Sequence, residues 1–120
     1  MLELQDIHSF YGSSHILHGI TLRVEKGEVL SILGRNGVGK TTFLKSLMGL
    51  TDRVTGTIRL DGVDLTQQPT HLRAKAGIAY VPQGREIVPG FTVEENILMG
   101  CYARRDGKRT VPPLIWELFP

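Results

Sequence analysis

The segment from Glu28 to Leu44, EVLSILGRNGVGKTTFL, constrains this chain more than any other stretch. It contains the pattern G-x-x-x-x-G-K-[ST] from Gly34 to Thr41, in which glycines let the backbone turn and approach a ligand closely. The apolar, β-branched run Val29–Leu33 before the pattern predicts a buried strand of a parallel sheet. After the loop, apolar residues at helical spacing predict a helix from Lys40 to Met48, which Gly49 ends.

A strand that leads into a glycine-rich loop and then directly into a helix forms an anion site. Backbone N–H groups converge there, and the helix dipole adds partial positive charge. We predict that Lys40 reaches the β- and γ-phosphates of a nucleotide, that Thr41 ligates Mg²⁺ and that Thr42 contacts the α-phosphate region. The alternative is a glycine-rich turn that binds nothing. The predicted nucleotide-binding residues of the loop are Gly34, Arg35, Asn36, Gly37, Val38, Gly39, Lys40, Thr41 and Thr42.

Composition and charge are those of an ordinary soluble globular domain. The 120 residues are 41% hydrophobic and 22% charged, with a formal charge of +2. This charge is small and scattered, and basic and aromatic residues do not interleave, so no nucleic-acid partner is expected. No apolar run approaches the length of a membrane span, and the N-terminus lacks a signal-peptide pattern. We therefore expect a cytoplasmic protein.

Residues that often build metal or redox sites are few. The single cysteine, Cys101, excludes an internal disulfide and a multi-cysteine metal site, so we expect an inert thiol. His15 and His18 are close in sequence but have no third ligand of suitable type nearby, which favours surface or supporting roles over metal binding.

The region before the loop predicts two half-buried strands, Leu2–Ile7 and Ile16–Val24, because apolar and polar residues alternate in both. Between them, Ser9–Ser14 is predicted to be a loop. An exposed Tyr11 on this loop is suited to stacking on a purine, because aromatic rings stack on any base. The alternative for Tyr11 is packing near the sheet edge.

Local signals also predict elements after the first helix. Gly56–Leu65 predicts a hairpin about Asp61-Gly62, and Pro69 opens a helix that runs toward Ala76 and ends at Gly77. Ile78–Val81 predicts a short buried strand, which delivers Gln83 to the edge of the sheet where ligands bind in open α/β folds.

The last third of the chain reads as a helix between less regular segments. Thr92 and Glu95 form a capping-box pattern that opens a helix to about Met99. The segment Gly84–Phe91 before it mixes charged and apolar residues, as contact surfaces do. Ala103–Pro113 is predicted to be a linker, and Leu114–Phe119 the start of an amphipathic helix.

Together these motifs resemble the amino-terminal half of an ABC-transporter ATP-binding subunit, over the whole chain. Tyr11 matches the adenine-stacking aromatic of the family's A-loop, GRNGVGKTT (34–42) its Walker A motif and Gln83 its Q-loop glutamine. The segments SHIL, KSLMGL, VPQGREI and TVEENILMG are most similar to the urea-type subunit of branched-chain amide importers, with branched-chain amino acid subunits as near neighbours. Val88 departs from the urea pattern, which has phenylalanine there.

The resemblance implies an α/β fold: a partial P-loop NTPase core of the ABC ATPase type, with an antiparallel β subdomain at the N-terminal side. Residues 1–82 correspond to the nucleotide-binding core and β subdomain, residues 83–120 to the Q-loop and the start of the helical subdomain, and the C-terminal half is absent. The implied cofactors are ATP and Mg²⁺, with Thr41 and Gln83 at the metal and Gln83 sensing the attacking water.

The resemblance also implies partners and a location. We expect transmembrane permease subunits, docked by Gly84–Gly100, and a second ATP-binding subunit. The subunit is then peripheral on the inner face of the cell membrane and drives import by hydrolysing ATP.

The family's signature motif, Walker B aspartate, catalytic glutamate and switch histidine do not occur in these 120 residues. We therefore expect the chain alone not to turn over ATP at a useful rate, since Mg²⁺ lacks an acidic anchor and water lacks a positioning base. We also expect exposed apolar surface and poor stability, because the strand that would flank the phosphate-loop strand is missing. The alternatives are a truncated, non-hydrolytic nucleotide-binding module and a small GTPase or nucleotide kinase. The second is disfavoured because no D-x-x-G or N-K-x-D motif occurs.

Overall fold

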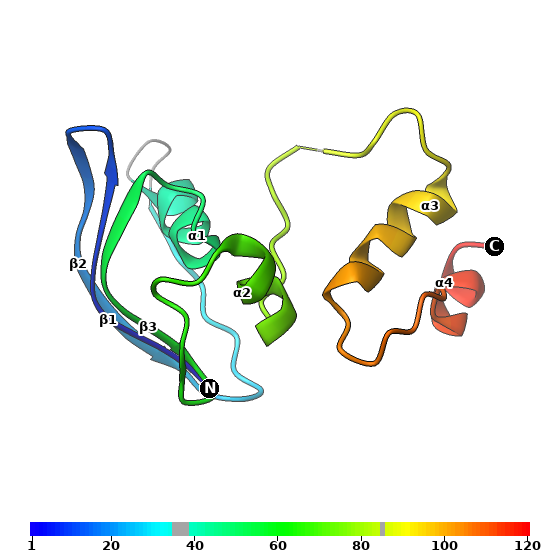
Figure 1. Cartoon of the computed structure of the whole chain (residues 1–120), viewed down its shortest axis with the longest axis horizontal. Coiled ribbons are helices and arrows are strands. Elements are labelled where there is room, and N and C mark those ends of the chain that lie inside the picture. Colours follow the sequence, from blue (N-terminus) through cyan, green and yellow to red (C-terminus); the bar gives the residue numbers. More distant parts are fainter. Residues whose placement is uncertain (35–38, 85) are drawn as a thin grey trace. The chain divides into compact units, whose positions relative to one another are not determined.

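The computed structural model describes residues 1–34, 39–84 and 86–120. The chain divides into two compact units, Met1–Tyr80 and Val81–Pro120. Figure 1 shows the strands and the helices α1 and α2 in the first unit, and α3 and α4 in the second.

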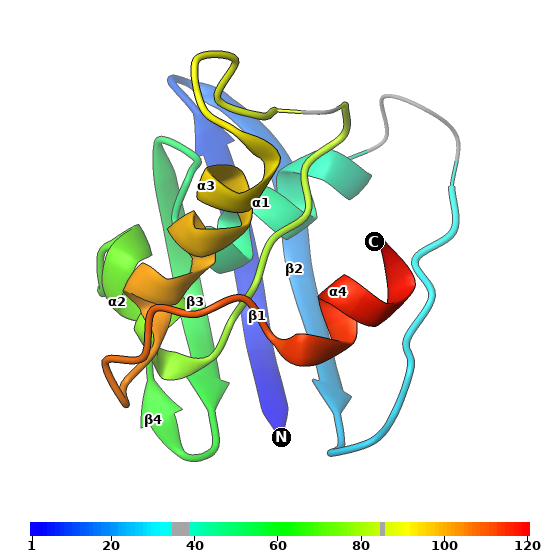
Figure 2. The ribbon, with the colours of Figure 1, turned by 90° about the vertical axis from the view of Figure 1, so that its right-hand side faces the viewer.

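The described part of the first unit contains one antiparallel sheet with the strand order β2-β1-β3-β4, which can be followed across Figure 2. This sheet confirms the antiparallel β subdomain predicted near the N-terminus. The first strand is longer than predicted, because it includes Ser9, Phe10 and Tyr11, which were predicted to lie in a loop. Ser9 and Phe10 pair with residues of both β2 and β3, and Tyr11 pairs with Ser14 across the hairpin turn. The strands are β1 Leu2–Tyr11, β2 Ser14–Val24, β3 Arg53–Leu60 and β4 Val63–Asp64.

A β-bulge at Asp6 decides which side chains of β1 face the core. Between the pairs Gln5↔Thr57 and His8↔Thr55 the register shifts, so that β1 contributes one residue more than β3. Asp6 has a positive φ of 50° there. Leu4 and Ile7 are both buried even though three positions separate them, because the extra residue restores the inward direction that simple alternation would lose.

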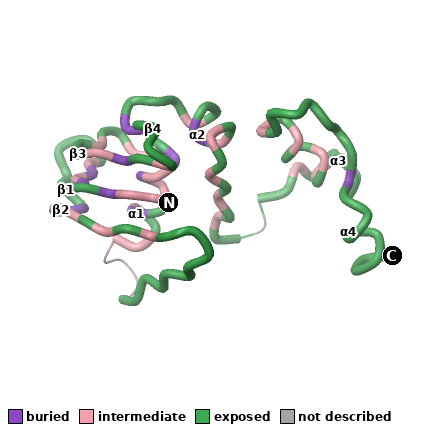
Figure 3. Tube along the Cα trace, turned by 90° about the horizontal axis from the view of Figure 1, so that it is seen from below, coloured by how far each residue is buried: buried purple, intermediate pink, exposed green. Residues whose placement is uncertain are grey.

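Two helices pack on the same face of this sheet (Figure 1): α1 Lys40–Met48 and α2 Thr70–Ala76. The first confirms the helix predicted after the loop, and Gly49 ends it in a left-handed conformation. The buried residues of this unit lie on β1, β2 and β3, on α1 and α2, and at positions 65–66 between β4 and α2; Figure 3 shows burial along the chain. The core cluster consists of Leu4, Ile7, Leu17, Phe43, Ile58 and Leu65.

The tight turn predicted at Asp61-Gly62 joins β3 to β4. Asp61 has a φ of 49° and Gly62 a φ of 81°, and two successive positive values are the mark of the hairpin turn that matches strand twist. The helix predicted from Pro69 is also confirmed, with Pro69 as its N-cap and Gly77 at its end.

Two predicted strands are not found. Val29–Leu33 and Ile78–Val81 lie in segments without helix or strand, and among the described residues no strand pairs with either. A strand requires hydrogen-bonded neighbours for its backbone N–H and C=O groups, and an apolar sequence does not provide them. In the first run the apolar side chains are exposed, as expected: Val29 is 94% exposed and Leu33 91%. In the second run Ile78 still packs against the core cluster.

The second unit contains short helices only, among the residues that the structure describes: α3 Val93–Leu98, the 3-10 helix η1 Met99–Ala103 and α4 Pro113–Leu118. The predicted capping box is present. The Glu95 N–H donates to Thr92 Oγ1 at 3.1 Å, and the Thr92 N–H donates to Glu95 Oε1 at 3.3 Å. None of the described helices is long and apolar enough to cross a bilayer.

Candidate functional site

The junction between the glycine-rich loop and α1 is held by Gly39. This residue has a φ of 97°, and a Cβ atom added to it would lie 3.2 Å from Leu17 Cδ2 and 3.7 Å from Ile16 Cγ2. Glycine is therefore required both by the backbone angle and by the close approach of the loop to β2. The helix starts immediately afterwards, since the Phe43 N–H donates to the Gly39 carbonyl at 2.8 Å.

Among the residues that the structure describes, no side chain caps the N-terminus of α1, and the first turn of this helix contains no acidic residue. Backbone N–H groups of the first turn are therefore left without intrahelical partners, at the positive end of the helix dipole. Such N–H groups can donate hydrogen bonds to an anion.

Lys40 is the first residue of α1, and its side chain reaches Gly34. Its Nζ donates to the Gly34 carbonyl at 2.5 Å, which brings the ammonium group to the beginning of the loop. Among the residues that the structure describes, no carboxylate forms an ion pair with Lys40. An ammonium held by a neutral carbonyl keeps its full charge for a phosphate.

The two threonines after Lys40 differ in their surroundings. Thr41 is exposed, so its hydroxyl is free to ligate a metal ion that also touches phosphate. Thr42 is half-buried, and its carbonyl accepts a hydrogen bond from Ser46 Oγ at 2.6 Å. The four loop residues Arg35, Asn36, Gly37 and Val38 lie outside the described residues.

An apolar groove of about 250 Å³ runs beside this junction. Its lining combines the core side of β2 with the run before the loop and the start of α1. Apolar walls next to a cationic loop exclude water and strengthen electrostatic attraction to a charged ligand. The lining residues are Leu17, Ile20, Leu22, Ile32, Leu33, Gly39, Lys40 and Phe43.

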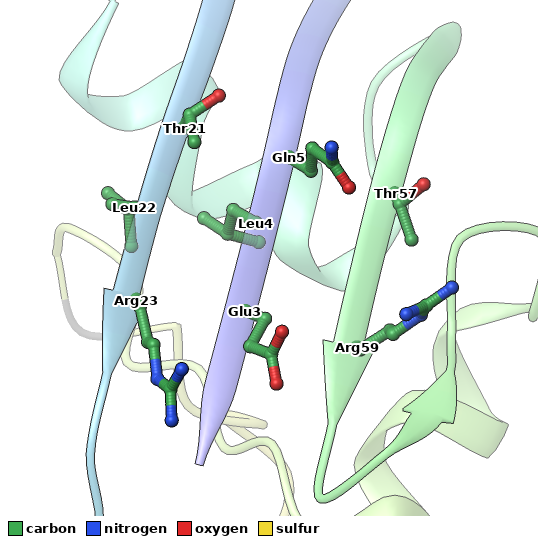
Figure 4. Close-up of a pocket in the computed structure, with 8 residues that line it drawn as sticks. All are labelled: Glu3, Leu4, Gln5, Thr21, Leu22, Arg23, Thr57 and Arg59. Atoms are coloured by element: carbon green, nitrogen blue, oxygen red, sulfur yellow. The ribbon is translucent and has the colours of Figure 1, made fainter.

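A second depression, of about 320 Å³, lies on the sheet and is lined only by β1, β2 and β3 (Figure 4). Glu3 stands between its cross-strand neighbours Arg23 and Arg59. Opposite charges on neighbouring strands stabilise the face of a sheet. This stabilisation accounts for the charged residues of the depression, so they need no bound ligand to explain them.

Tyr11 ends β1 and is 37% exposed. It pairs with Ser14 across the hairpin, and the Gly12 N–H beside it donates to Asp52 Oδ2 at 2.6 Å. The turn that carries the ring is thus tied to the segment before β3, which leaves the ring on an anchored support and partly open to solvent.

Gln83 belongs to the second unit and is exposed. Gly84 follows it with a φ of 90°, so the chain turns directly after the glutamine. Arg85 lies outside the described residues.

Three histidines lie together on β1 and β2: the sequence had paired His15 with His18, and the structure adds His8. His8 Nδ1 and His15 Nε2 are 2.9 Å apart, and His8 Nε2 lies 3.0 Å from Asp6 Oδ1. The rings of His15 and His18 are 4.0 Å apart. Desolvation, followed by the charges of His18 and His8, lowers the pKa of His15. The pairing of β1 with β2 creates this cluster, and among described residues no metal-binding group of three or more ligands is formed.

The sequence pattern Gly34–Thr41, followed directly by the helix α1, is that of a phosphate-binding-loop protein. The family model described as ABC transporter matches residues 17–116, so the chain belongs to the ABC transporter family. It is 36% identical over 121 residues to the high-affinity branched-chain amino acid transport ATP-binding protein BraG of Pseudomonas aeruginosa, with 100% of this chain and 52% of BraG covered.

Further relatives carry other names. Identity is 37% to the probable branched-chain amino acid transport ATP-binding protein LivF of Archaeoglobus fulgidus, over 85% of this chain and 43% of LivF. It is 40% to the hemin import ATP-binding protein HmuV of Jannaschia sp., over 94% of this chain and 41% of HmuV. The chain thus spans about half the length of the curated relatives it matches.

A solved structure, described as the ATP-binding subunit of an ABC transporter, superposes with a TM-score of 0.73 at 28% sequence identity. The superposition covers 98% of this chain and 46% of that structure. The fold is therefore part of an ABC ATP-binding core, as the sequence resemblance predicted.

Proposed function

We propose that this chain binds Mg-ATP at the loop Gly34–Thr42 and forms the ATP-binding part of an ABC importer. One observation carries the proposal: the ammonium of Lys40 lies at the beginning of a glycine-rich loop, in front of a helix with no cap and no acidic residue in its first turn. Positive charge and unpaired N–H groups at one place are what a polyphosphate requires.

The roles of the remaining site residues follow from their chemistry. Tyr11 stacks on adenine, and the backbone N–H groups of residues 34–42 bind phosphate oxygens. Thr41 supplies a hydroxyl ligand to Mg²⁺, an ion that neutralises phosphate charge when bound. Gln83 has the role of sensing Mg²⁺ and the attacking water in this proposal.

Residues 1–82 act in this proposal as nucleotide-binding core and β subdomain, and residues 83–120 as the Q-loop and the start of a helical subdomain. The partners are transmembrane permease subunits and a second ATP-binding subunit, at the inner face of the cell membrane. Family membership and the exposed apolar side chains of the second unit support this assembly.

Two substrate classes are considered for the importer. Urea or short-chain amides are favoured by the sequence segments named above, whereas branched-chain amino acids are favoured by the names of BraG and LivF. The nucleotide site itself does not touch a transported substrate, so both classes use the same ATP chemistry.

The 120 residues bind ATP in this proposal without hydrolysing it at a useful rate. None of them supplies the paired acidic residues that anchor Mg²⁺ and position water in the family. A binding module without turnover is therefore the alternative form of the same function.

The deciding experiment is a titration of the chain with a fluorescent ATP analogue, with and without Mg²⁺. The proposal requires saturable binding that unlabelled ATP displaces and that Mg²⁺ strengthens. Absence of saturable binding would refute both the transport-ATPase and the binding-module forms.

A further inference from the structure

Two hydroxyl groups are buried in the otherwise apolar layer between β1 and α1. Ser9 and Ser46 are both 0% exposed, and their Oγ atoms are hydrogen-bonded to each other. Ser46 Oγ is also bonded to the Thr42 carbonyl at 2.6 Å. Buried hydroxyls are unfavourable unless they are paired, so this group is stable only while strand and helix keep one alignment.

The direction of these bonds follows from the donors available. A carbonyl only accepts, so Ser46 must use its single proton on Thr42. Ser9 must then donate to Ser46 Oγ. The result is a continuous chain from Ser9 through Ser46 to the backbone of Thr42.

This chain joins two parts of the proposed nucleotide site. At one end, Ser9 lies two residues before Tyr11 on the same strand. At the other end, Thr42 lies in the first turn of α1, directly after Lys40 and Thr41. The strand that presents the stacking ring is thus held to the turn that presents the phosphate ligands, through side chains that no nucleotide reaches.

We propose that Ser9 and Ser46 are positioning residues for ATP: they set the alignment in which one nucleotide reaches Tyr11 with its base and the loop with its phosphates. The inference rests on the proposed function. ATP has a fixed covalent distance between adenine and phosphates, so misalignment of strand and helix weakens one contact or the other. A ligand without a base spans only the loop and is insensitive to that alignment.

The test compares Mg-ATP with inorganic tripolyphosphate in the full chain. For Ser46→Ala and for Ser9→Ala we expect the Kd of Mg-ATP to rise about tenfold. The Kd of tripolyphosphate is expected to change by less than about twofold, because the loop and its lysine are intact. A purely structural role for the pair would weaken both ligands to the same extent.

Thr66→Val provides a control of matched chemistry. Thr66 is 8% exposed, and its Oγ1 accepts from the Ile58 N–H at 2.9 Å and donates to Asp64 at 2.6 Å. Both bonds of this hydroxyl stay within β3 and β4, and the Thr66 carbonyl, which shares Arg73 with the Ser46 carbonyl, is kept in the variant. This variant also loses a buried hydroxyl, but its ratio of ATP to tripolyphosphate affinity should equal that of the unaltered chain.

The double variant Ser9→Ala/Ser46→Ala tests whether the two serines act together. It also removes both partners of their hydrogen bond, so neither serine hydroxyl is left buried without a partner, as Ser9 would be in Ser46→Ala alone. If they act through one chain of hydrogen bonds, the double change raises the Kd of Mg-ATP no more than Ser46→Ala alone.

Three outcomes overturn the inference. The first is an equal rise in Kd for Mg-ATP and tripolyphosphate, and the second is an unchanged Kd of Mg-ATP in the Ser46→Ala variant. The third is a rise in the Kd of Mg-ATP in the double variant that equals the product of the two single rises. If the unaltered chain binds neither ligand, the proposed function itself is wrong, which separates the two failures.

Discussion

Arg73 of α2 donates from Nη1 to the carbonyl of Ser46 on α1 at 2.9 Å, and this bond ties the two helices together. The same side chain also donates to the carbonyls of Leu47, Thr66 and Gln68. Arg73 is 3% exposed, and burial lowers the pKa of its guanidinium. The buried guanidinium thus binds the carbonyls of Ser46 and Leu47 at the C-terminal end of α1. The helix dipole favours a positive charge at this end.

Replacement of Arg73 by methionine is expected to destabilise the first unit by about 3 kcal/mol or more, because several buried carbonyls lose their donor. Urea unfolding measures this loss. Arg73→Lys keeps the charge but offers a single ammonium in place of the planar fork, so its loss should be intermediate. A methionine variant as stable as the original chain would show that the carbonyls find other partners.

Gly56 faces the bulge of β1, where the backbone leaves no room for a side chain. A Cβ atom there would lie 2.3 Å from the Asp6 carbonyl oxygen and 2.6 Å from that of Gln5, and φ is 98°. We expect Gly56→Ala to lower stability by at least about 3 kcal/mol. Gly62→Ala is the control. Gly62 also has positive φ, but its Cβ would meet no atom within 4 Å, so strain of about 1 kcal/mol is expected. Equal losses in thermal unfolding would contradict the close contact.

The histidine cluster predicts lower stability in acid. The pKa of His15 lies below its ordinary value of 6.5, because desolvation and the charges of His18, His8 and Arg53 disfavour the imidazolium. The carboxylate that faces this cluster is Asp6, which is hydrogen-bonded to His8. As the pH falls through 6.5, the unfolded chain therefore binds more protons than the folded one, and the free energy of unfolding decreases.

The measurement is the urea midpoint at about pH 7.5 and at about pH 5. His15→Gln should reduce the difference between the two midpoints. His71→Gln alters an exposed histidine of α2 and should leave it unchanged. An identical acid dependence in all three proteins would exclude His15 as its source.

Thr92 determines where α3 begins. We expect Thr92→Ala to cost about 1 kcal/mol of local helix stability, seen as faster hydrogen exchange of the Glu95 amide, by about fivefold. Thr92→Ser retains the hydroxyl and should retain most of the protection. Unchanged exchange in the alanine variant would show that the capping box contributes nothing to the helix.

Lys40→Ala is expected to raise the Kd of Mg-ATP about a hundredfold, since the charged contact to phosphate is lost while the fold remains. The control is Lys45→Ala, which alters the lysine in the last turn of the same helix. Circular dichroism should be the same for both variants. If ATP binds Lys40→Ala as tightly as the original chain, the phosphate role of this loop is wrong.

Features that depend on neighbouring residues were predictable from the sequence. The helix after the loop, the turn at Asp61-Gly62 and the capping box of Thr92 all occur where their patterns predicted them. Each rests on bonds within a few residues, so the local sequence suffices to specify it. The roles of Tyr11, Gln83 and the phosphate loop remain predictions that nucleotide binding must test.

Contacts between distant segments were decided by the tertiary structure. Four features join segments that no local pattern relates. They are the bulge opposite Gly56, the carbonyls bound by Arg73, the Asp6–His8–His15 cluster and the Ser9–Ser46 pair. The run Val29–Leu33 shows the converse, because its composition suits a strand but no described strand pairs with it. Local sequence thus determined the helices α1, α2 and α3 and the turn at Asp61-Gly62. Only the folded structure decided strand pairing and buried polar contacts, because both require partners brought together from far along the chain.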